Sequence, residues 1–110
     1  MGLFSKKETR QEKRDKLMEV AAKVTLHNAE KRIHEAVKNS KIIFLSDDRV
    51  TYTNRAGNLN EYTIDGLAEE LYRIFDEQYQ SINFYGNSPS FALIGVTTQD
   101  IKELILKERK

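Results

Sequence analysis

The sequence has no cysteine, no tryptophan and a single proline among its 110 residues. Without cysteine the chain can form neither a disulfide framework nor a thiol nucleophile. A zinc site would have to use His27, His34 and carboxylates alone. The lack of cysteine is also compatible with a cytoplasmic protein, which is the location we expect.

Long apolar runs are missing as well. No stretch approaches the roughly 18 apolar residues that a membrane-spanning helix needs. The apolar start around Leu3 and Phe4 is too short for a secretory signal. The chain also lacks a phosphate-binding glycine loop and a serine in a nucleophile elbow. We therefore expect no enzymatic activity and no cofactor.

Neither sign of charge dominates the chain, whose formal net charge is +1. The charges are nevertheless unevenly placed, since residues 6–16 and 101–110 are basic and residues 61–80 are acidic. A dedicated nucleic-acid-binding domain usually has a much higher isoelectric point than this chain. The uneven charge is typical of solvated helix faces, and it could also serve complementarity within an assembly.

The strongest pattern that is present covers residues 65–80. At about 100° per residue the apolar side chains of this stretch share one face and the charged ones share the other. The apolar set consists of Leu67, Ala68, Leu71, Tyr72, Ile74, Phe75 and Tyr79. An amphipathic helix of this kind must pack on something, so the pattern predicts a folded domain with a core.

The N-terminal third predicts a second helix with two different apolar faces. Residues 1–16 read as a charged, partly mobile arm, and residues 17–110 as one α+β domain. From residue 17 onward one stripe contains Leu17, Val20, Ala21 and Val24. A second, nearly opposite stripe contains Leu26, Ala29, Ile33, Ala36 and Val37. Either the helix contacts two surfaces, or it bends or breaks near Thr25, whose β-branched side chain weakens helical preference.

The remaining segments predict strands and a last helix. Five segments read as strands separated by turn residues, namely the apolar runs 42–45 and 91–96, the alternating segment 50–53, and the segments 59–64 and 81–85. Thr97 followed by Asp100 predicts a capping box at the start of a C-terminal helix. The expected fold is therefore α+β in the order α-β-β-β-α-β-β-α, with a five-stranded, mostly antiparallel sheet.

Two segments carry a resemblance to a known family. Residues 42–54, IIFLSDDRVTYTN, and residues 91–106, FALIGVTTQDIKELIL, resemble the early strands and the closing strand and helix of small bacterial PH-like domains. The resemblance covers about a quarter of the chain and implies a PH-like fold as the alternative. The helix predicted over 65–80 departs from that family, which continues with strands there.

Side-chain clusters that could carry chemistry are few. His27, Glu30 and His34 share a helix face, but two turns separate the histidines by roughly 10 Å, too far to bind one ion directly. Asp47 and Asp48 are what a β-turn selects for. We therefore expect no metal site and no catalytic residue.

These observations favour a small accessory or regulatory protein, of a bacterial or phage kind, that binds a protein and also itself. The second stripe adjoins the strands, so it should pack on the sheet and leave the first stripe uncovered. The expected homodimer interface is Leu17, Val20, Ala21 and Val24. The alternative is nucleic-acid binding by the basic arm, through Lys6, Lys7, Arg10, Lys13, Arg14 and Lys16.

Overall fold

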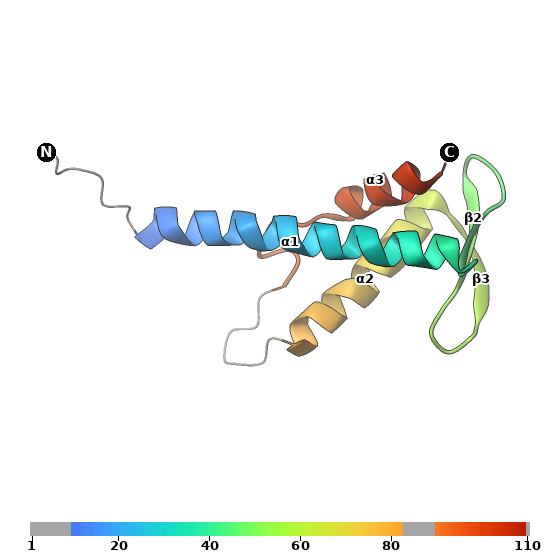
Figure 1. The fold of residues 1–110 in the computed structure, drawn as a ribbon, viewed down its shortest axis with the longest axis horizontal. Helices are drawn as coiled ribbons and strands as arrows, with labels where there is room; N and C mark the ends of the chain where they lie inside the picture. Colours follow the sequence, from blue (N-terminus) through green and yellow to red (C-terminus); the bar gives the residue numbers. More distant parts are fainter. Residues whose placement is uncertain (1–9, 83–89, 110) are drawn as a thin grey trace, which may run out of the picture.

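The computed structural model describes residues 10–82 and 90–109, and within them the chain forms three helices and one three-stranded sheet (Figure 1). The α+β class predicted from the sequence is confirmed. The elements are α1 (Arg10–Lys38), β1 (Ile42–Phe44), β2 (Arg49–Thr53), β3 (Leu59–Thr63), α2 (Ile64–Ile82) and α3 (Thr98–Glu108).

Helix α1 is one continuous helix of 29 residues. It does not break at Thr25, which is buried at the centre of the helix with 8% of its surface exposed. Residues 10–16, predicted as part of a charged, partly mobile arm, are helical and continuous with the rest of α1. The helix ends at Lys38, and the amide of Lys41 then donates to the carbonyl of Ala36 at 2.7 Å.

The sheet is antiparallel in the order β1-β2-β3. Ile42 lies opposite Tyr52, and Val50 lies opposite both Phe44 and Tyr62. Ile42 and Val50 are buried, whereas Ile43, between Ile42 and Phe44, is exposed. The alternation means that one face of the sheet covers the core and the other faces away from it.

The predicted fourth and fifth strands are wrong. Ser81 and Ile82 continue α2, and residues 83–89 lie outside the described residues. Residues 91–95 form a turn, in which the amide of Val96 donates to the carbonyl of Phe91 at 2.9 Å and that of Gly95 to Ala92 at 3.2 Å. This pair of bonds, with Gly95 at a φ of +83°, is the arrangement that ends a helix, here after a single turn.

A short apolar run cannot be assigned to strand or helix from its periodicity alone, and this is where the prediction failed. Gly95 was the signal for a helical turn. It needs the left-handed conformation that a side chain disfavours. Phe91 and Ile94, three residues apart, are both buried, while Leu93 is 60% exposed, as a helical turn requires and a doubly covered strand does not.

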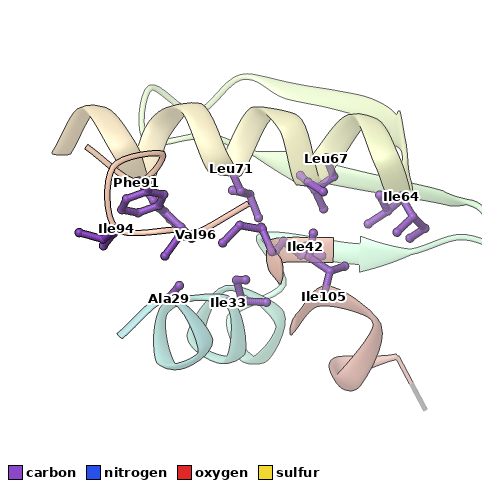
Figure 2. Packing of buried hydrophobic residues seen from close by; sticks show 14 residues of the cluster. Ala29, Ile33, Ile42, Ile64, Leu67, Leu71, Phe91, Ile94, Val96 and Ile105 are labelled. Carbon is purple, nitrogen blue, oxygen red and sulfur yellow. The ribbon is translucent and has the colours of Figure 1, made fainter. Parts of the chain in front are cut away.

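The core lies between the helices and is closed at one end by the sheet. Figure 2 shows Ile64, Leu67 and Leu71 pointing from α2 toward Ala29 and Ile33 of α1. The turn adds Phe91, Ile94 and Val96, and α3 adds Ile101 and Ile105.

Two hydrogen bonds hold the turn against α2. Tyr72 Oη donates to the carbonyl of Val96 at 3.0 Å, and the amide of Phe91 donates to Asp76 Oδ1 at 2.9 Å. The predicted capping box of α3 is confirmed, since Thr97 and Asp100 each accept from the other's backbone amide.

The molecule is elongated, with extents of 60 × 31 × 20 Å. A helix of 29 residues is itself about 43 Å long. Helix α3 packs on both α1 and α2. The C-terminal end of α2 diverges from α1, and the first half of α1 extends past α2 and α3 (Figure 1).

Candidate functional site

Three large apolar side chains are exposed on the first half of α1. Leu17 is 70% exposed, Val20 58% and Val24 53%. Their spacing of three and four residues places them on one side of the helix. This side lies opposite the face that buries Ala29 and Ile33 in the core. We call Leu17, Val20 and Val24 the α1 stripe.

The fourth predicted interface residue, Ala21, does not belong to this exposed set. It is half-buried and packs against the core cluster together with Met18 and Ala22. At about 100° from Val20 around the helix, its small side chain turns toward the body of the molecule. The expectation that all four residues lack a contact within the chain is therefore wrong for Ala21.

The basic residues proposed for nucleic-acid contact lie before the stripe. Lys13, Arg14 and Lys16 are exposed on α1. The same turns also carry Glu12 and Asp15, so the described part of this region is only weakly basic. Lys6 and Lys7 lie outside the described residues, as does the side chain of Arg10.

Beside the stripe, a groove runs between α1 and α2 where the two helices diverge. It consists of two hollows of about 430 and 550 Å³ that share Arg32, Arg55, Phe75 and Gln78. Val24 lines one end and Ala36 the other. Val24 and Ala36 are twelve positions apart on α1. At a rise of about 1.5 Å per residue, the groove is therefore about 18 Å long.

The two ends of the groove differ in chemistry. The end near Val24 has an apolar floor of Ala29, Phe75 and Phe91. Tyr79 covers the edge of this floor, with its ring 5.5 Å from that of Phe91. The other end is lined by polar residues of the β2–β3 hairpin and by Lys41.

Arg32 and Arg55 both line the middle of the groove, where the two hollows join. The guanidinium of Arg32 lies over the ring of Phe75, 4.3 Å from its centroid, in a cation–π contact. Burial lowers the pKa of Arg32, and the charge of Arg55 lowers it further, while Tyr52 opposes the shift. Arg32 remains protonated, because an arginine does not lose its proton in a protein.

Arg32 and Arg55 were not predicted as site residues. In sequence Arg32 is one of many charges on α1, and Arg55 is one residue of a hairpin loop. The two are 23 positions apart, and no periodicity relates a helix to a loop. Only the fold brings them to one groove.

The structure also shows the contacts of the histidine and carboxylate residues for which we predicted no metal-binding or catalytic role. Glu30 accepts from Lys107 Nζ at 2.6 Å, and His34 Nδ1 lies 2.9 Å from Glu108 Oε1, so these residues join α1 to α3. The carbonyls of Asp47 and Asp48 accept from Arg109 and from the amide of Ile64. In the described part of the chain no three metal-binding side chains gather at one point.

Comparisons with protein-family models, curated proteins and solved structures give no match for this chain. The resemblance to small bacterial PH-like domains therefore remains a prediction. Among the described residues, no helix is long and apolar enough to cross a membrane.

Proposed function

We propose that this protein is a non-enzymatic binding protein that associates with a second copy of itself through the α1 stripe. The observation that carries the proposal is the exposure of Leu17, Val20 and Val24, each more than half accessible on the half of α1 that extends past the body. Contiguous exposed apolar side chains tend to mark interaction surfaces. A cytoplasmic location and a regulatory role are part of the same proposal.

Two α1 helices related by a twofold axis would cover the α1 stripe of both copies. In an antiparallel pair, Leu17 of one copy would face Val24 of the other, with Val20 near the axis, so the same patch would serve both copies. Three side chains cover less area than an interface of standard size, so we expect a dissociation constant in the micromolar range, roughly 1–100 µM.

Light scattering across a range of protein concentrations tests the dimer. The protein should pass from monomer to dimer mass, and Val20→Glu should keep it monomeric and folded, because a charge would be buried in the interface. The matched control is Leu59→Glu, which places the same charge at an apolar residue that is 61% exposed in β3. A monomer mass at all concentrations, or a dimer that survives Val20→Glu, would contradict the proposal.

Salt separates this proposal from nucleic-acid binding by the basic arm. Contacts to phosphates weaken steeply as salt rises, because bound counterions are released. Apolar association does not weaken in this way. A labelled oligonucleotide that binds at low salt, and that is lost on combined substitution of Lys13, Arg14 and Lys16, would favour the nucleic-acid alternative.

A further inference from the structure

The groove between α1 and α2 is lined by Arg32 and Arg55, which no carboxylate of the described residues pairs with. Among the described residues, neither Arg32 nor Arg55 forms an ion pair or a hydrogen bond to a side chain. Glu70 lines the groove, but it is paired with Arg73 at 2.7 Å. Two arginines therefore line the same groove without a carboxylate partner among the described residues.

Both arginines are exposed to solvent, which screens the repulsion between their charges. Part of the Arg32 guanidinium has nevertheless given up water to lie on the ring of Phe75. An anion between the two guanidinium groups would relieve the repulsion that remains. Arginine suits this task because its planar fork can bind a carboxylate through two parallel hydrogen bonds.

We propose that this groove binds a short segment of a partner protein in which a carboxylate stands beside a large apolar side chain. The carboxylate would lie between Arg32 and Arg55. The apolar side chain would lie at one end of the groove, against the exposed side chain of Val24. This is a second binding surface, which meets the α1 stripe only at Val24.

The length of the groove favours a peptide as the occupant. About 18 Å corresponds to five or six residues of extended chain at about 3.3 Å each. An isolated anion would fill only the centre and leave the end near Val24 empty. A segment with its glutamate or aspartate near the middle reaches the centre and the apolar end together.

The test uses the full-length protein and an array of blocked octapeptides. Each peptide carries one glutamate at position four and a phenylalanine or leucine one to three positions away, and a matched array carries glutamine instead. We expect fluorescence anisotropy to detect glutamate peptides that bind and to show about tenfold weaker binding for their glutamine copies, as the loss of a charged hydrogen bond implies.

Substitutions then locate the binding. Arg55→Gln and Arg32→Gln should each weaken binding of the best glutamate peptide about tenfold or more, whereas Arg55→Lys should weaken it less. Arg55 lies in a loop, so its removal leaves the helix packing intact if Arg32→Gln disturbs the fold. The control Lys31→Gln removes a positive charge from an exposed site of α1 outside the groove and should leave binding unchanged.

Three results would overturn the proposal. The first is that no glutamate peptide binds at ~1 mM, the weak limit of specific recognition. The second is binding that survives both arginine substitutions. The third is inorganic phosphate or an RNA oligonucleotide binding the groove more tightly than any peptide. The dimer is tested separately, since Val20→Glu should change the mass and spare peptide binding, while Arg55→Gln should do the reverse.

Discussion

Ser40 is the described residue other than glycine that adopts a left-handed backbone, with a φ of 62°. Its amide donates to the carbonyl of Val37 at 3.1 Å, and that of Lys41 donates to Ala36, so Ser40 occupies the position after a helix where glycine is preferred. A side chain in this conformation costs about 1–2 kcal/mol, and glycine avoids that cost.

We expect Ser40→Gly to raise the free energy of unfolding by roughly 0.5–1 kcal/mol. Glycine removes the cost of the left-handed conformation, but it also gives the unfolded chain more conformational entropy, which offsets part of the gain. Chemical denaturation measures the change. Ser46→Gly, at an exposed bend without a positive φ, is the control and should be neutral or slightly destabilising. A loss of stability in Ser40→Gly would show that the left-handed conformation is not strained.

Ile94 and Leu93 are adjacent but differ in burial, at 7% and 60% exposed. We expect Ile94→Ala to destabilise by roughly 2–5 kcal/mol, as large-to-small changes in a core do. Leu93→Ala should cost less than about 0.5 kcal/mol, as surface substitutions do. Equal and large losses at both positions, measured by denaturation, would instead support a strand covered on both faces.

At the scale of elements, α3 is tied to α1 by a pair of contacts between distant parts of the chain. Lys107 Nζ lies 2.6 Å from Glu30 Oε2, and His34 lies beside Glu108. The hydrogen bond from Lys107, with its positive charge, lowers the pKa of Glu30, and the same pair raises the pKa of Lys107.

This pair should make the stability of the protein depend on pH. A carboxylate whose pKa is lowered by folding stabilises the folded state above its unfolded pKa, about 4.3 for glutamate. The contribution is lost as pH falls through the lower, folded value. Both groups are exposed, so we expect a small effect that salt weakens further.

The measurement compares wild type with Lys107→Gln from pH 7 down to pH 2. The difference in unfolding free energy should be present near neutral pH and should vanish at the acidic end. Lys31→Gln, on the same helix as Glu30, serves as the control and should show no such trend. A difference that is constant over the whole range would mean that the contact does not involve the ionised carboxylate.

At the scale of the whole molecule, the body holds only part of α1. Contacts with the core cluster begin at Met18 and become complete at Ala29 and Ile33. Residues 12–16 are exposed, and this part of α1 relies on the hydrogen bonds of the helix itself. A helix end held in this way opens more readily than one packed in a core.

Amide hydrogen exchange should therefore form a gradient along α1. We expect residues 12–16 to exchange at close to unprotected rates and Ile33 to exchange at a rate set by global unfolding. If the α1 stripe pairs two copies, exchange around Val20 should slow as protein concentration rises. Protection at residues 12–16 equal to that of Ile33 at low concentration would contradict this gradient.

Local patterns allowed the prediction of much of this fold. The apolar face of α2 follows from a period of 3.6 residues, and Thr97 with Asp100 identifies the start of α3. The alternation of Val50 and its neighbours predicts β2. The run from Phe91 was misassigned, because an apolar run of six residues fits a strand and a helical turn equally well. The apolar periodicity of α2 likewise did not show where the helix ends, and we placed a strand where Ser81 continues it.

The α+β class and the two apolar faces of α1 follow from local patterns, because both depend on the spacing of side chains along one segment. The position of the second stripe next to the strands also indicated which face would be covered, whereas the packing of Ala21 against the core came from the tertiary structure, since it depends on where the other elements lie. The tertiary structure also placed Arg32 and Arg55 together across a groove. Their proximity arises from the angle between α1 and α2 and from the position of the β2–β3 hairpin, and no local pattern encodes either.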